Sequence, residues 1–84
     1  MTTNNAISKL TKSGFSVEVE NHAGNQTTII ARKAGLSRFV WMTAQAGTVC
    51  VIKTVPVKDE SDILTDYFPG TFWNTLAKAL KNAA

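Results

Sequence analysis

The strict alternation of apolar and polar residues from Phe15 to Glu20 constrains the fold of this chain more than any other feature of its sequence. One side of the segment carries Phe15, Val17 and Val19, and the other carries Ser16, Glu18 and Glu20. A period of two residues is typical of a strand with one buried face. The segment therefore predicts an antiparallel sheet that packs on a core with one face only.

Three later segments have the β-branched or apolar composition of strands, and turn-forming residues separate them. These strands are expected over residues 27–32, 38–43 and 48–55, with connections at 21–25, 33–36 and 44–47. Pro56 ends the last strand or lies on a free edge of the sheet, because proline lacks the N–H that the interior of a sheet requires. Short connections join strands that are neighbours in the sheet, so the four strands are predicted to form an antiparallel meander.

A helix is expected near each end of the chain. Residues 4–13 have Asn4 or Asn5 as a cap, and Gly14 supplies the left-handed exit. Residues 72–82 can be capped by Thr71, and their apolar stripe consists of Trp73, Leu76, Ala77 and Leu80. Residues 57–70 are expected to form a long loop. The predicted fold class is therefore α+β, in the order α-β-β-β-β-α, within a single domain over residues 1–84.

Composition narrows the classes of protein to which the chain can belong. Nine Lys and Arg against six Asp and Glu give a net charge of +3, which suits weak attraction to nucleic acid or simply solubility. The single cysteine cannot form an internal disulfide, and no cleavable signal is evident, so the expected location is the cytoplasm, or a host cytoplasm if a phage encodes the chain. No apolar run approaches the roughly 20 residues that cross a bilayer, so no membrane span is expected.

Parity assigns the strand residues to two faces if the large rings of Phe39 and Trp41 point toward the helices together with Phe15. The helix side then also holds Val17, Val19, Thr27, Ile29, Ala31, Thr48, Cys50 and Ile52. The second side holds Ser16, Glu18, Glu20, Thr28, Ile30, Arg32, Arg38, Val40, Met42, Val49, Val51 and Lys53. A sheet with helices on one face usually exposes a polar surface on the other, whereas the centre of this second face is apolar.

The predicted second face combines an apolar patch with a basic end. The patch would expose on the order of a few hundred Å², a size that marks interfaces, and consists of Ile30, Val40, Met42, Val49 and Val51. A meander would gather Arg32, Arg38 and Lys53 at one end, with Lys33 nearby. The candidate partner-binding residues are therefore Ile30, Arg32, Arg38, Val40, Met42, Val51 and Lys53, and from the long loop Asp62, Asp66 and Tyr67. The face can be covered by a terminal helix, by a second copy of the chain or by a foreign partner.

The sequence predicts no catalytic residues, no metal site and no cofactor. His22 is the only histidine and Cys50 the only thiol, so neither a Cys₂His₂ zinc set nor a cysteine–histidine pair follows from the spacing. Cys50 is expected to be buried as a small apolar residue. The acids between residues 59 and 66 lack the glycine and closing glutamate of a calcium loop. Phe39 and Trp41 form a stacking platform for single-stranded RNA only if their parity is inverted.

Segments 10–17 (LTKSGFSV) and 65–70 (TDYFPG) resemble stretches of proteins from mobile elements. With its small size and its lack of an enzyme motif, the chain resembles the small accessory proteins of phages and mobile elements, anti-CRISPR proteins in particular. This resemblance implies a non-enzymatic inhibitor that binds a protein or ribonucleoprotein defence complex and blocks access to it. Two alternatives stay open. One is a nucleic-acid-binding accessory protein that acts through Arg32, Lys33, Arg38 and Lys53, and the other is a structural homodimer.

Overall fold

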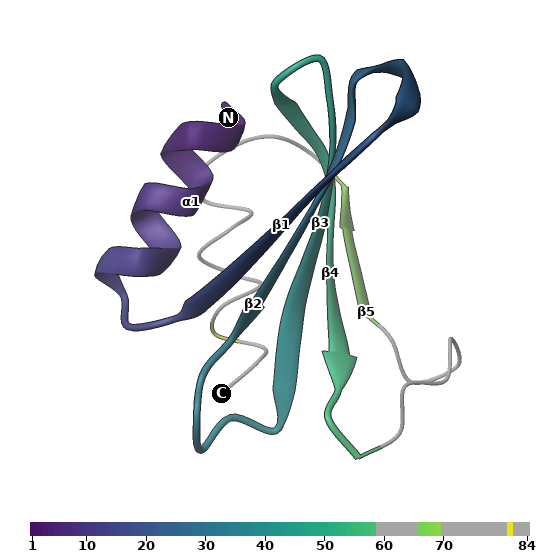
Figure 1. Cartoon of the computed structure of the whole chain (residues 1–84). Coiled ribbons are helices and arrows are strands. Elements are labelled where there is room, and N and C mark those ends of the chain that lie inside the picture. Colours follow the sequence, from purple (N-terminus) through teal and green to yellow (C-terminus); the bar gives the residue numbers. More distant parts are fainter. Residues whose placement is uncertain (59–65, 70–80, 82–84) are drawn as a thin grey trace.

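The computed structural model describes residues 1–58, 66–69 and 81, and within residues 1–58 a helix packs on one side of an antiparallel sheet (Figure 1). The helix, α1, covers Thr3–Lys12. The strands are β1 (Ser16–His22), β2 (Gln26–Arg32), β3 (Arg38–Gln45), β4 (Thr48–Pro56) and β5 (Asp66–Pro69), and a short 3₁₀ turn, η1 (Ala23–Asn25), joins β1 to β2. The strands lie in the order β1-β2-β3-β4-β5. The predicted α+β class and the meander of the first four strands are confirmed.

The C-terminal part of the prediction needs one correction. Residues 57–70 were expected to be a loop, but Asp66–Pro69 pairs with β4 as a fifth strand, with Tyr67 opposite Lys53. The acids and the Pro-Gly pair of this segment indicate a loop, but aromatic residues favour strands, and the edge of β4 offers backbone groups for them to pair with. The helix expected over residues 72–82 lies, apart from Lys81, outside the described residues.

Helix α1 begins and ends through local hydrogen bonds. The Thr2 side chain, rather than Asn4 or Asn5, caps the helix, because its hydroxyl oxygen accepts a bond of 3.2 Å from the Asn5 backbone N–H. At the other end, Gly14 has a φ of +90°, and the Phe15 N–H donates to the Leu10 carbonyl at 3.1 Å. The predicted left-handed exit at Gly14 is therefore confirmed.

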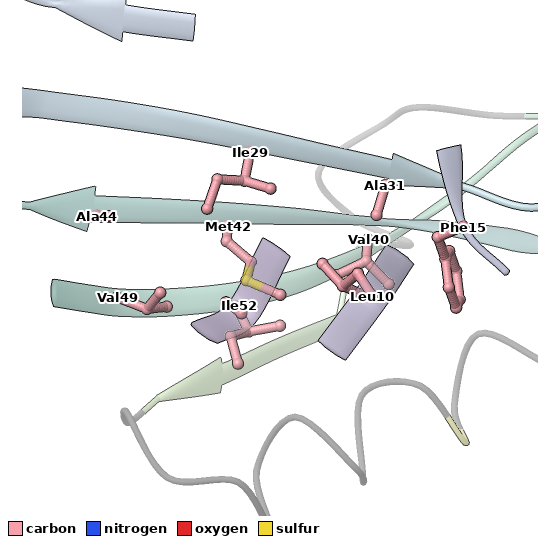
Figure 2. Packing of buried hydrophobic residues seen from close by; sticks show 10 residues of the cluster. Leu10, Phe15, Ile29, Ala31, Val40, Met42, Ala44, Val49 and Ile52 are labelled. Carbon is pink, nitrogen blue, oxygen red and sulfur yellow. The ribbon is translucent and has the colours of Figure 1, made fainter. Parts of the chain in front are cut away.

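The core lies between α1 and the sheet (Figure 2). The helix contributes Ala6 and Leu10, and Phe15 closes the cluster where the chain enters β1. The strands contribute Ile29, Ala31, Val40, Met42, Ala44, Val49 and Ile52. Val17 packs against the edge of this cluster, whereas Val19 on the same strand is 44% exposed. The alternation in β1 thus predicts the correct face.

The face of β3 that packs on the core is not the one predicted from the sequence. Val40 and Met42 are fully buried beneath α1, while Phe39 and Trp41 lie on the other side of the sheet. The register explains this placement, because Val40 pairs with Ala31 and Met42 with Ile29, and residues directly opposite in an antiparallel pair share a face. The large rings of β3 are therefore not part of the main core.

A β-bulge in β4 changes the faces of a second strand. Thr43 pairs with Val51 and Ala44 with Val49, which leaves Cys50 as the extra residue. Val49 and Ile52 are consequently both buried although they are three positions apart. The expectation that Val49 lies on the second face is wrong, and so is the expectation that Cys50 is buried, because Cys50 is exposed.

The exposure of Cys50 gives a testable prediction. In the folded protein, we expect iodoacetamide to alkylate Cys50 at a rate within about tenfold of that of the urea-unfolded chain, because the thiol lies at a surface bulge. Mass spectrometry of timed samples measures this rate. A rate in the folded protein that is thousands of times lower would place the thiol in the core.

The turn between β3 and β4 contains a strained residue. Gln45 pairs with Thr48, so Ala46 and Gly47 form a two-residue hairpin loop with φ values of +50° and +79°. A left-handed conformation costs an alanine roughly 1–2 kcal/mol that glycine avoids. Ala46→Gly is therefore expected to raise the free energy of unfolding by about 1 kcal/mol in urea titrations. Ala34→Gly is the matched control, since Ala34 is an exposed turn residue without a positive φ. Equal losses of stability in both variants would contradict this reasoning.

Candidate binding surface on the open sheet face

The face of the sheet opposite α1 is the candidate binding surface, and we call it the open face. None of the described helices lies on it (Figure 1). The register assigns it Glu18 and Glu20 from β1, Thr28, Ile30 and Arg32 from β2, Phe39, Trp41 and Thr43 from β3, and Val51, Lys53 and Val55 from β4. One row runs straight across four strands and consists of Glu18, Ile30, Trp41 and Lys53.

Two cation–aromatic pairs occupy the centre of the open face. The Arg32 guanidinium carbon lies 4.2 Å from the centre of the Phe39 ring, and the Lys53 ammonium nitrogen lies 4.5 Å from the centre of the Trp41 ring. The two rings adjoin each other, with centroids 6.5 Å apart and planes inclined by 37°. Each pair contributes about 0.5–1 kcal/mol at an exposed site. The pairs hold two positive charges close to two aromatic rings.

Most of the apolar and aromatic side chains on the open face are buried or half-buried. Phe39 is only 2% exposed, with the Arg32 guanidinium over its ring, and Val55 beside it is also buried. Ile30 and Trp41 are half-buried. Among the open-face residues, Val51 is the large aliphatic side chain that is well exposed, at 39%. A ligand on the open face would therefore contact mainly the charged groups and the Trp41 ring.

Acidic residues border the open face on one side. Glu18 and Glu20 are exposed on β1, which is an edge strand among the described residues. Strands in a sheet lie about 4.8 Å apart, so Glu18 and Lys53 are separated by roughly 14 Å across the row. Charges on an edge strand also oppose pairing with the strand of another molecule. The open face thus changes from acidic at β1 to cationic and aromatic over β2, β3 and β4.

His22 lies at the end of this acidic border but does not form a catalytic relay. Its Nε2 atom forms a hydrogen bond of 3.0 Å with the Thr28 hydroxyl and lies 3.8 Å from the Glu20 carboxylate. A relay requires the carboxylate and the hydroxyl on different ring nitrogens, whereas here both contact the same nitrogen. The described part of the chain also contains no group of three His, Cys, Asp or Glu side chains that could hold a metal ion.

The predicted partner-binding residues are divided between the two faces. Ile30, Arg32, Val51 and Lys53 lie on the open face as expected. Val40 and Met42 are in the core, so the expectation that they bind a partner is wrong. In β5, Asp66 and Tyr67 lie opposite Thr54 and Lys53 in the register, and Asp62 lies outside the described residues.

The predicted basic cluster at one end of the sheet is also corrected. Arg38 shares the parity of Val40, so it lies on the α1 side, where its Nη1 donates to the Thr54 carbonyl at 3.2 Å. Lys33 also faces that side, because its Nζ donates to the Ser13 carbonyl at 2.9 Å and lies 5.6 Å from the centre of the Phe15 ring. Only Arg32 and Lys53 of the predicted cluster remain on the open face.

A second depression lies at the end of the sheet where two hairpins meet. It is lined by Asn21, His22, Asn25, Gln26, Thr27, Ala46 and Gly47. The two hairpins are joined there, since the Ala46 N–H donates to the Asn25 carbonyl at 3.0 Å and the Gln45 amide donates to the Gly24 carbonyl at 2.7 Å. These bonds satisfy polar groups within the chain, so the depression is explained by the structure of the turns.

Comparisons of the chain with protein-family models, curated proteins and solved structures found no match. Within the described ranges, no helix is long and apolar enough to cross a membrane. The case for a function therefore rests on the geometry of the open face.

Proposed function

We propose that this chain is a non-enzymatic binding protein and that the open face of its sheet is the surface that contacts its partner. The observation that supports this most strongly is the pair of cation–aromatic contacts, Arg32 on Phe39 and Lys53 on Trp41, side by side on a face that α1 does not cover. Tryptophan and arginine are the residues most often responsible for binding energy at interfaces. The solvated face of an antiparallel sheet is usually polar, whereas this face places each of two cations against an aromatic ring.

The mode of action that we propose is occlusion of a protein or ribonucleoprotein complex. The resemblance of the chain to anti-CRISPR proteins supports this mode. A single rigid face on a chain of 84 residues is also suited to covering a site on a larger partner. Such a protein needs neither a cofactor nor a catalytic residue, because it acts by steric exclusion.

Site-specific photocross-linking in cells of the native host tests the surface. A benzoyl-phenylalanine replaces Thr43, which is exposed on the open face, or Ser8, which is exposed on α1. We expect a discrete adduct from position 43 and none from position 8. The double substitution Trp41→Leu and Lys53→Glu in the position 43 protein should remove the adduct, because it eliminates the aromatic ring and reverses the charge.

Two results would contradict the proposed binding surface. Adducts from position 8 alone would place the interface on the helix. An adduct from position 43 that persists unchanged in the double variant would show that contact does not depend on Trp41 and Lys53.

A further inference from the structure

We infer that the ligand of the open face is a single-stranded nucleic acid, with a base stacked on Trp41 and phosphates bound by Arg32 and Lys53. This inference rests on the proposed function, since it assigns a ligand to the same face. It depends on the observed parity of β3, which places both aromatic rings outside the main core.

Trp41 is the side chain of the open face on which a base can stack. The Trp41 ring is half-buried, and its neighbours in the row are Ile30 on β2 and Lys53 on β4. Proteins that bind single strands combine such aromatic platforms on a sheet with adjacent positive charge. Every base has a π face, so one partly accessible tryptophan ring is enough to anchor a nucleotide without reading its sequence.

Two cations of the open face can bind phosphates. Arg32 and Lys53 lie on β2 and β4, on either side of the β3 rings, and each is placed against a ring by a cation–π contact. Because the Lys53 ammonium lies over the Trp41 ring, a base that stacks on this ring must displace the ammonium, which then lies close to the phosphate of the same nucleotide. The Arg32 guanidinium suits the next phosphate because it offers paired N–H donors. This charge complementarity favours a polyanion.

The acidic border and the buried apolar side chains limit what can occupy the open face. Glu18 and Glu20 repel phosphates, which confines a bound strand to β2, β3 and β4. A stable protein interface has a well-packed apolar centre within roughly 800 Å² per partner, whereas the apolar side chains of this face are mostly recessed. The open face is therefore better suited to stacked bases, such as those of the nucleic acid in a ribonucleoprotein complex, than to an apolar interface with a second copy of this chain.

Fluorescence anisotropy with the full chain and labelled 20-nucleotide strands tests the inference. The probes are oligo-dT, oligo-rU and a DNA duplex of equal length, at salt concentrations between 50 and 200 mM. We expect both single strands to bind more tightly than the duplex. The slope of log K against log salt should lie between about −1 and −2, because each phosphate contact on a single strand contributes about −0.7.

Matched variants separate stacking from charge. Trp41→Leu should weaken binding by roughly 5- to 150-fold, whereas Trp41→Phe should restore most of the affinity because it retains a stacking ring. Lys53→Ala should make the salt slope less steep by about 0.7. Lys9→Ala, which removes an exposed cation from α1, should change affinity less than twofold. Unfolding midpoints of all four variants confirm that the fold is retained.

Three outcomes would overturn the inference. The first is no binding at 50 mM salt. The second is equal affinity for duplex and single strand with Trp41→Leu unchanged, which indicates general attraction to charge. The third is a dimer in light scattering that Trp41→Leu dissociates, which assigns the face to a second copy.

The cross-linking experiment distinguishes failure of the inference from failure of the proposed function. A nuclease-sensitive adduct from position 43 supports both. A nuclease-resistant protein adduct that needs Trp41 and Lys53, together with no oligonucleotide binding, overturns the nucleic-acid ligand but retains the binding surface. No adduct and no oligonucleotide binding overturn both.

Discussion

Replacement of Val40 by glutamate is expected to unfold the protein at 25 °C. Val40 is fully buried between Ala31 and Thr54, beneath α1. A carboxylate introduced there, without a partner, costs several kcal/mol, whether it stays charged or takes up a proton. A small domain has only about 5–15 kcal/mol of stability in total, so a large loss follows. Far-UV circular dichroism and urea titration measure the effect.

Thr43→Glu is the control for this substitution. Thr43 is exposed on the open face of the same strand, so its replacement should change the free energy of unfolding by about 0.5 kcal/mol or less. A Val40→Glu protein that unfolds at the same urea concentration as the original chain would contradict the assignment of faces in β3. It would also return Val40 to the surface, where the sequence alone places it.

Leu10→Ala is expected to lower the free energy of unfolding by about 2–5 kcal/mol. The Leu10 side chain is fully buried and is the largest group that α1 inserts into the core (Figure 2). Its removal leaves a cavity between the helix and the strands, and neighbouring side chains fill such cavities only in part. Urea unfolding followed by circular dichroism gives the magnitude.

Lys9→Ala provides the comparison on the same helix. Lys9 is exposed, and alanine is at least as good a helix former, so its replacement should change stability by less than about 0.5 kcal/mol. Equal effects of the two substitutions would mean that α1 does not pack on the sheet through Leu10.

The fold was largely predictable wherever one residue pattern had a single interpretation. The alternation of Phe15 to Glu20 places Val17 against the core, and Gly14 ends α1 with a positive φ as expected. Glycine and asparagine mark the turns because few other residues adopt their backbone angles at low cost. These signals are local, so one sequence is enough to interpret them.

The faces of β3 could not be assigned from the rings alone, because both parities of residues 39–42 are apolar. Large rings usually lie in the main core, and that preference gave the wrong face here. A better signal exists at the end of the strand. One parity continues to Ala44, while the other continues to Thr43 and Gln45, which are polar and exposed. The predicted strand ends at Thr43, so it does not include Ala44 and Gln45, the residues that distinguish the two faces.

The bulge at Cys50 and the strand β5 both arise from pairing between strands. The periodicity of residues along one segment does not indicate with which residues that segment pairs. An extra residue in β4 is accommodated only because Thr43 and Ala44 pair with Val51 and Val49. Of the candidate residues, Ile30, Arg32, Val51 and Lys53 are placed on the correct face from sequence, because β2 and the second half of β4 keep a simple alternation. Phe39 and Trp41 were missed through the error in β3.

That inversion changes what the open face can bind. With Val40 and Met42 outside, the face would be an apolar patch with a basic end and no aromatic ring. With Phe39 and Trp41 outside, each ring carries a cation, and the face acquires both stacking and charge. The proposed binding surface and its nucleic-acid ligand both depend on this placement.

A nuclear Overhauser spectrum of the folded chain tests that placement most directly. The structure predicts cross-peaks from the Leu10 methyl protons to the side-chain protons of Val40 or Met42, which belong to the same buried cluster. It predicts none from Leu10 to the indole protons of Trp41, because the sheet lies between them. Cross-peaks from Leu10 to the Trp41 indole, with none to Val40 or Met42, would contradict the account.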